Sequence, residues 1–239
     1  MKANLFKLSV AVLICLLSYT PVWSQQETAN FLLNKVYQKI QKANDYSVNA
    51  HIKVDMPFIK MLPVDAKIYF KQKDKFKVES KSIALIPLQG FDQLSKMLSD
   101  TNQFTSMIQG SEQVGNITTK IINVIPLYDT TDLILGKLWV DPVRYLVLKL
   151  QITTKSSGTI ITEYEYGTQA AYSLPDAMVF TIDVKKFKIP KIMGADVHQP
   201  KSVANEKQEE KKKGKIVVKL SNYLINKGIE DSFFINKKQ

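Results

Sequence analysis

The sequence predicts an α+β protein in which about eight antiparallel strands form one twisted sheet, with few helices to close it. Two observations support this prediction. After residue 47, apolar and polar residues alternate along most of the chain, and short polar turns separate the alternating runs. Helical spacing of apolar residues, in contrast, occurs only around residue 35 and in one stretch in the middle of the chain.

The first 24 residues have the pattern of a signal peptide. Lys2 and Lys7 precede an apolar run from Leu8 to Leu17, and the residues up to Ser24 suit cleavage after that serine. The run is shorter than the roughly 20 residues of a membrane-spanning helix. We therefore expect residues 1–24 to be removed on export. The remaining 215 of the 239 residues, 25–239, are expected to form a single domain.

The cysteine count and the charge argue against several classes of function. Cys15, the sole cysteine, lies inside the signal segment and follows no small lipobox residue, so we expect a soluble mature chain without disulfides or thiolate sites. The formal charge is +11, but Arg144 is the only arginine, and arginine is favoured for phosphate and base recognition. Nucleic acid is therefore not expected as a partner. An anionic membrane surface suits the lysines better, and a solvated surface kept soluble by charge suits them best.

The mature chain is expected to begin with an amphipathic helix, ETANFLLNKVYQKIQKAND, with Thr28 as its N-cap. One stripe of this helix is apolar and the lysines lie off it; the stripe is formed by Leu32, Val36, Ile40 and Ala43. The alternation then changes to a period of two, which predicts a half-buried strand over residues 48–55. A hairpin follows, with strands at 66–70 and 75–80, so that Phe70 and Phe76 share its apolar face.

The middle of the chain predicts two short helices with a break at residues 99–102. The first would present Phe91, Leu94 and Leu98 on one face, and the second would present Phe104, Met107 and Ile108. Such stripes usually belong to an ordinary core. Helices of this kind also cover openings in sheets.

Strands are predicted for most of the remaining chain, at residues 121–125, 133–140, 143–152, 158–166, 177–187 and 214–226. Their alternation assigns apolar faces to Leu146, Leu148, Leu150 and Ile152; to Ile160, Tyr164 and Tyr166; to Met178, Phe180, Ile182 and Val184; and to Ile216, Val218 and Leu220. Between the last two strands, residues 191–214 are rich in lysine and glutamate. We expect a disordered surface loop there, with contact to an acidic partner as the alternative.

Catalytic motifs are absent from the sequence. His51 and His198 are the only histidines, and no nucleophile elbow, zinc-protease motif, phosphate loop or dinucleotide fingerprint occurs. Glu163 and Glu165 form the best carboxylate pair, about 7 Å apart along a strand, but solvent-facing alternation explains them without chemistry. The sequence therefore predicts no enzyme, no cofactor and no metal site.

The order of elements resembles the periplasmic lipoprotein-carrier family, the LolA-like outer-membrane lipoprotein-sorting proteins. LWVDPVRYLVLKLQ resembles the central strand pair of that family, SLPDAMVF its Leu-Pro-Asp entry into a late strand, and YLINKGIEDSFF its closing strand and turn. The resemblance extends over most of Thr28 to Phe234.

This resemblance implies an unclosed half-barrel in the periplasm, whose concave apolar face is covered by helices and holds lipoprotein acyl chains or phospholipid. The implied lipid-binding residues are Phe70, Phe76, Leu146, Leu148, Leu150, Ile160, Phe180 and Ile182, and the implied lid residues are Leu32, Val36, Ile40, Leu94, Leu98 and Met107. The implied partners are an inner-membrane exporter and an outer-membrane acceptor, with the protein itself a monomer. A non-enzymatic envelope sensor or binding module on the same fold is the alternative.

Two local expectations accompany the resemblance. In the family, an arginine beside an early-strand phenylalanine helps to lock the lid, but this chain has Lys75-Phe76-Lys77. Lysine lacks the planar donor fork of arginine, so a lid lock at Lys77 is not expected. At the other end, the last strand is expected to complete the half-barrel, with Phe233 and Phe234 holding the tail against the sheet.

Overall fold

A computed structural model describes residues 28–56, 61–73, 75–81, 95, 97–128, 132–156, 158–183 and 213–235. The predictions for the signal peptide, for Phe91, Leu94 and Val184, and for residues 191–212 of the expected loop fall outside the described residues, whereas Lys213 and Gly214 belong to the last strand. No helix in the described part of the chain is long and apolar enough to cross a bilayer.

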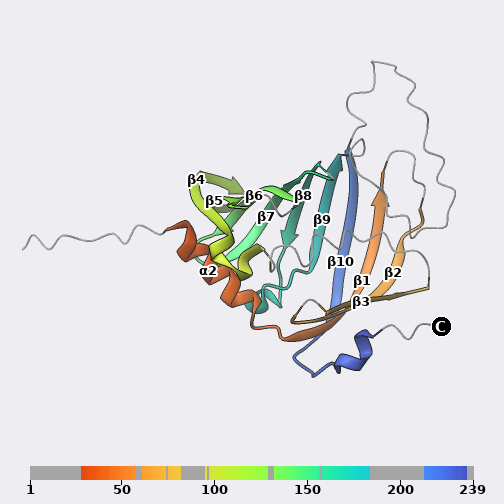
Figure 1. Ribbon diagram of the computed structural model, residues 1–239. Coiled ribbons are helices and arrows are strands. Elements are labelled where there is room, and N and C mark those ends of the chain that lie inside the picture. The colour runs from red at the N-terminus through yellow and green to blue at the C-terminus, as the bar shows by residue number, and fades with distance from the viewer. Residues whose placement is uncertain are drawn as a thin grey trace, which may run out of the picture.

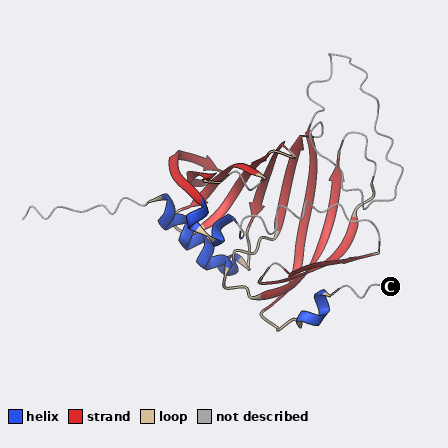
Figure 2. Ribbon diagram, in the orientation of Figure 1, coloured by secondary structure: helices blue, strands red, loops and turns tan. Residues whose placement is uncertain are grey.

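One antiparallel sheet of ten strands forms the body of the molecule (Figures 1 and 2). The strands are β1 (Asp45–Asp55), β2 (Val64–Lys71), β3 (Lys75–Ser80), β4 (Phe104–Val114), β5 (Ile117–Pro126), β6 (Leu133–Asp141), β7 (Leu146–Thr154), β8 (Gly158–Glu165), β9 (Ala177–Asp183) and β10 (Lys213–Ile225). The spatial order is β3-β2-β1-β10-β9-β8-β7-β6-β5-β4, so β3 and β4 lie at opposite ends and the sheet stays open. This confirms the predicted mainly antiparallel, unclosed α+β fold.

The last strand lies in the middle of the sheet. β10 lies between β1 and β9 and is paired on both sides, with Ala50 opposite Leu220 and Ile216 opposite Phe180. It therefore joins the first three strands to the other six in the middle of the sheet. The sequence predicted that this strand completes the half-barrel, and the strand order shows that it does so from the middle of the sheet.

Helix α2 (Ala29–Ile40) forms as the sequence predicts. Thr28 caps it, because its Oγ1 accepts a hydrogen bond from the backbone N–H of Phe31 at 3.1 Å. The apolar stripe packs over β4 to β7 and is buried at Ala29, Leu32, Leu33 and Val36. Short 3-10 turns follow elsewhere in the chain, at η1 (Thr101–Gln103), η2 (Ala170–Tyr172) and η4 (Asp231–Phe234).

The middle of the chain corrects one of the two predicted helices. Ser95 and residues 97–99 are helical, which is consistent with the first. The second is wrong, since Phe104, Met107 and Ile108 lie on β4, which pairs with β5 over its whole length. Residues 107–113 of β4 are exposed on both faces, so no burial alternation marks this strand in the sequence.

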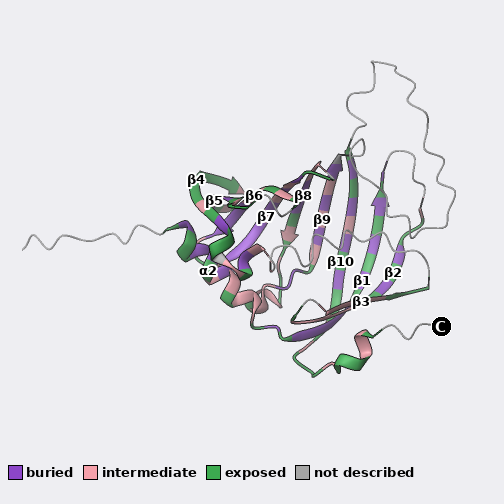
Figure 3. Ribbon diagram, in the orientation of Figure 1, coloured by how far each residue is buried: buried purple, intermediate pink, exposed green. Residues whose placement is uncertain are grey.

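Two apolar clusters lie side by side on the sheet, and the buried residues in Figure 3 belong largely to them. The α2 cluster joins α2 to β4, β5, β6 and β7; its strand members are Phe104, Ile122, Val124, Leu138, Val140, Val147, Leu150 and Ile152, together with Leu98. The β10 cluster joins β1, β2, β8, β9 and β10; it includes Val48, Ile52, Ile68, Met178, Phe180, Ile182, Ile216 and Val218. Tyr164 on β8 packs against both clusters and marks their boundary.

A bulge changes the face pattern of β7. The pairing register with β6 shifts between Trp139 and Val140, opposite Leu148. The simple alternation predicted for Leu146, Leu148, Leu150 and Ile152 is therefore interrupted. Leu150 and Ile152 belong to the α2 cluster together with Val147, whereas Leu146 and Leu148 are buried outside both clusters.

Candidate functional site

A cavity of about 70 Å³ lies where the two clusters meet. Its aliphatic walls come from the end of α2 (Val36 and Ile40), from β7 (Val147) and from β9 (Met178). Its aromatic walls come from widely separated parts of the chain and comprise Tyr46, Phe70, Tyr164, Tyr166, Tyr172 and Tyr223. None of the described lining residues carries a charge at neutral pH.

Two tyrosine hydroxyls of this cavity, those of Tyr166 and Tyr223, donate hydrogen bonds to backbone carbonyl oxygens. Tyr223 donates to the carbonyl oxygen of Pro175 at 2.7 Å, and Tyr166 donates to the carbonyl oxygen of Val147 at 3.0 Å. Burial raises the pKa of Tyr164, Tyr166 and Tyr223 well above the usual value for tyrosine. The walls therefore present aromatic ring faces, and the hydroxyls of Tyr166 and Tyr223 are already engaged in hydrogen bonds. Such walls suit an uncharged apolar ligand.

The residues predicted to bind lipid divide into two groups. Phe70 lines the cavity and stacks on Tyr46, with ring centroids 5.1 Å apart, and Phe76 is partly buried against the β10 cluster. The other six are buried and do not line the cavity; they are Leu146, Leu148, Leu150, Ile160, Phe180 and Ile182. Their binding of lipid stays a prediction.

The predicted lid residues are also divided. Leu32, Val36 and Leu98 are buried in the α2 cluster, and Ile40 is a partly buried residue of the cavity wall. Met107 lies on strand β4 with 57% of its surface exposed. It is not on a covering helix, because the helix predicted around it does not form.

Polar contacts fasten α2 to the sheet at both ends. Ser106 on β4 donates to the side chain of Asn30 at 2.5 Å, near the start of the helix. Lys39, in the last turn, donates to the carbonyl oxygen of Arg144 at 2.7 Å. Arg144 belongs to the turn between β6 and β7, so the helix end is tied to the same strands that its apolar face covers.

The turn that receives Lys39 is itself rigidly held. Asp141 accepts hydrogen bonds from the backbone N–H groups of Val143 and Arg144, at 2.9 and 3.0 Å, and from the Arg144 guanidinium at 2.6 Å. Burial alone would raise the pKa of Asp141, but the bonds from Arg144 and Val143 outweigh it and lower the pKa. Asp141 is therefore a structural anchor for α2 and an ionised one.

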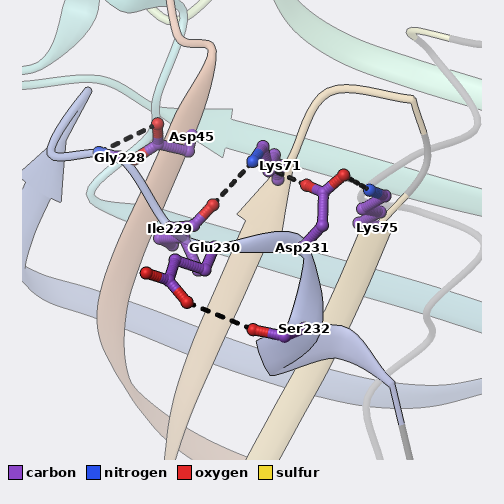
Figure 4. Close-up of polar contacts among 8 residues, drawn as sticks. All are labelled: Asp45, Lys71, Lys75, Gly228, Ile229, Glu230, Asp231 and Ser232. Carbon is purple, nitrogen blue, oxygen red and sulfur yellow. Dashed lines mark hydrogen bonds and ion pairs between the residues drawn. The ribbon is translucent and has the colours of Figure 1, made fainter.

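The C-terminal strap, residues 226–235, crosses the outer side of β1, β2 and β3 (Figure 4). Asp45 is buried and accepts a hydrogen bond from the backbone N–H of Gly228 at 3.1 Å. Lys71 donates to the carbonyl oxygen of Ile229 at 2.6 Å and pairs with Asp231 at the same distance. Lys75 also pairs with Asp231, so two lysines of the hairpin hold one carboxylate.

The strap ends on an aromatic contact. The ring of Phe233 lies 4.6 Å from that of Tyr69, and the Lys77 ammonium lies 4.1 Å above it. Lys77 also donates to the carbonyl oxygen of Phe233 at 3.2 Å. Phe233 therefore holds the tail against the sheet as predicted, while Phe234 packs on Phe233. Among its described contacts, Lys77 serves the strap and not a lid.

The ion pairs of Asp231 in the strap predict how the stability of the fold depends on pH. Hydrogen bonds from Lys71, and then from Lys75, lower the pKa of Asp231 to about 2, from an ordinary value of 3.8. Because the pKa of Asp231 is lower in the folded state, its ion pairs stabilise the fold fully at pH values above 3.8. This contribution is lost as the pH falls through about 2. In an NMR titration we expect Lys71→Met to raise the pKa of Asp231 toward 3.8. The matched change Lys213→Met, on β10, should leave it unchanged; equal effects would contradict the assigned pairing.

Other candidate groups lie away from the cavity. Glu163 and Glu165 are exposed on the face of β8 opposite Tyr164, which agrees with their predicted solvent-facing role. His51 is half exposed and bonds Asp65 at 2.8 Å. Within the described residues, no group of three histidine, aspartate, glutamate or cysteine side chains could hold a metal ion.

Sequence reasoning missed several residues of the cavity. Tyr46 and Tyr223 were not singled out, and the loop Tyr172–Pro175 was noted only for its Leu-Pro-Asp motif. The remaining signal in the sequence is a high density of tyrosine at the ends of strands, and it identifies a cavity only when the strand order is known.

Comparison with known proteins identifies the fold by structure alone, since no protein family model and no curated protein matches the chain. A LolA superfamily protein from Nitrosomonas europaea superposes with a TM-score of 0.54 at 10% identity, covering 88% of this chain and 98% of the other. A putative outer membrane lipoprotein-sorting protein domain from Vibrio parahaemolyticus superposes with a TM-score of 0.53 at 9% identity, covering 84% of this chain and 95% of the other. A DUF1329 family protein from Desulfovibrio piger superposes with a TM-score of 0.51 at 12% identity, covering 86% of this chain and 96% of the other. The protein therefore has a LolA-like fold.

Proposed function

We propose that the protein is a non-enzymatic periplasmic carrier that binds acyl chains of lipoproteins or other lipids and moves them toward the outer membrane. The observation that carries this proposal is the uncharged cavity of aliphatic and aromatic side chains at the boundary of the two clusters. The LolA-like fold supports it, because one of the similar structures is described as a lipoprotein-sorting domain.

The energetics of the cargo agree with a carrier. An acyl chain of about 16 carbons costs roughly 12 kcal/mol when exposed to water, at about 0.8 kcal/mol for each methylene. Such a chain crosses an aqueous compartment only with its surface covered. Removing the lipid from water and later releasing it requires an apolar site whose own side chains compete for the same surface.

The cavity holds only part of such a ligand. Ligand sites typically enclose about 300–1,000 Å³, and this cavity has about 70 Å³. Binding a whole chain therefore requires the two clusters to separate at the cavity, which Ile40 and Tyr164 both line. An exporter in the inner membrane and an acceptor in the outer membrane are the partners that this proposal implies.

Mass spectrometry of the protein purified from a periplasm without detergent tests the proposal. We expect acylated protein or phospholipid in near-stoichiometric amount, and the intact mass should place cleavage after Ser24. Ile40→Ser, in the cavity wall, should reduce the bound lipid, whereas the matched Leu224→Ser, at an exposed site on β10, should not. An empty protein that also fails to take up a fluorescent acyl probe would exclude lipid carriage.

A further inference from the structure

One polar atom of the cavity wall lacks a partner. Ser173 lines the cavity, and its Oγ is buried with no hydrogen-bond partner in the described part of the chain. The hydroxyls of Tyr166 and Tyr223, on the same wall, are both bonded to carbonyl oxygens. A buried hydroxyl without a partner destabilises the folded state, so its presence at a cavity points to a ligand atom that completes the bond.

The backbone at this position is strained as well. Ser173 follows the short turn η2 and has φ 55° and ψ 29°, in the left-handed region that favours glycine. The loop is held on both sides of Ser173. Before it, the backbone N–H of Tyr172 donates to the carbonyl oxygen of Gln169 at 3.0 Å; after it, the backbone N–H of Asp176 donates to the carbonyl oxygen of Glu165 at 2.7 Å, and Tyr223 donates to that of Pro175. Glycine would meet the conformational need of this turn with less strain, but it would carry no hydroxyl.

The chemistry of the wall selects the atom that Ser173 would bind. A hydroxyl donates well to a carbonyl oxygen. A free carboxylate would find no lysine, arginine or histidine among the described lining residues, and a buried charge without a counter-ion is strongly disfavoured. A hydrocarbon offers no acceptor at all. The wall therefore suits a neutral ester or amide carbonyl attached to an apolar chain.

We propose that Ser173 donates a hydrogen bond to the carbonyl oxygen of a neutral acyl ester or amide, which makes such acylated molecules, and not free fatty acids or hydrocarbons, the preferred ligands. This inference rests on the proposed function and names the ligand class of the same cavity. Ser173 is thus a specificity-determining residue, and it contacts the one polar group that the acyl chains of lipoproteins and phospholipids share.

Competition binding tests the inference. The chain from residue 25, loaded with a fluorescent acyl probe, is titrated with monopalmitoylglycerol, palmitate and hexadecane, each of which has a chain of about 16 carbons. We expect the ester to compete best. Ser173→Ala and Ser173→Gly should weaken the affinity for the ester by about three- to tenfold, which is the effect of one neutral hydrogen bond. The affinity for hexadecane should stay unchanged. Ser111→Ala, at an exposed site on β4 outside the cavity wall, is the matched control and should leave binding of the ester unchanged.

The outcomes separate the two proposals. If the wild type and both Ser173 variants bind the probe and have equal affinity for the ester, the proposed role of Ser173 is overturned, whereas the carrier proposal stands. Failure of the wild type to bind the probe or any competitor would overturn the carrier proposal itself. The thermal unfolding of Ser173→Gly provides a second check, because removal of a strained, unpartnered hydroxyl should not lower the melting temperature. A clear decrease would show that the hydroxyl has a structural partner, contrary to the inference.

Discussion

Phe180→Ala is expected to lower the free energy of unfolding by about 3–5 kcal/mol, because the substitution leaves a large cavity in a well-packed core. Phe180 has 0% of its surface exposed and lies on β9 between Ile216 of β10 and Thr162 of β8. Urea unfolding followed by circular dichroism measures the change. A loss below about 1 kcal/mol would show that the β10 cluster is loosely packed and open to a ligand in the free protein.

Phe70 provides the matched comparison for this prediction. It is also a phenylalanine of the concave face, but it is partly exposed and lines the cavity beside Tyr46. We expect Phe70→Ala to cost less stability than Phe180→Ala and to reduce the lipid that copurifies with the protein. The two variants thereby separate residues that hold the fold together from residues that meet the ligand. The opposite ranking would mean that the cavity is part of the structural core.

The sequence predicted the strands well where one face of the sheet is buried. In β1, for example, Ala50, Ile52 and Val54 are buried while Asn49, His51 and Lys53 are exposed, and such alternation is visible without a structure. In β4 both faces are exposed over residues 107–113, so the spacing of Phe104, Met107 and Ile108 matched a helix by coincidence. Pairing with β5, which decides the conformation of this segment, is a contact between residues that no local pattern shows.

The candidate site was less predictable than the fold, for a physical reason. Its wall combines Tyr46 of β1, Tyr164 of β8 and Tyr223 of β10, which become neighbours only because β10 inserts between β1 and β9. Apolar alternation selects all inward side chains alike and does not separate core residues from cavity residues. Ser173 was missed because its significance depends on the burial and unpaired state of a single oxygen atom.

Helix α2, three residues of which were predicted to belong to a lid, makes polar contacts with the sheet and the turns. A mobile lid would be held weakly, but α2 is tied by Asn30 to Ser106 and by Lys39 to Arg144. Beyond the helix, Gln72 donates to the carbonyl oxygen of Gln41 at 2.9 Å, and Asn226 accepts from the backbone N–H of Asn44 at 2.7 Å. These contacts fix the helix and the segment that follows it. We therefore expect α2 to remain in place when a ligand enters.

Leu32→Ala tests that expectation and should lower the free energy of unfolding by about 2–5 kcal/mol. Leu32 is fully buried in the α2 cluster, whereas Phe31, the matched control on the same helix, is 43% exposed and should cost clearly less when changed to alanine. Denaturant unfolding measures both variants, and uptake of the acyl probe is compared for each folded molecule. If α2 stays in place, Leu32→Ala lowers stability without changing uptake. If α2 detaches for loading, weakening its packing makes the open state more accessible, and uptake rises in the same variant. An increase in uptake would thus support α2 as a mobile lid. Constant uptake would assign the opening to the other walls of the cavity, where Phe70 and the loop at Ser173 lie.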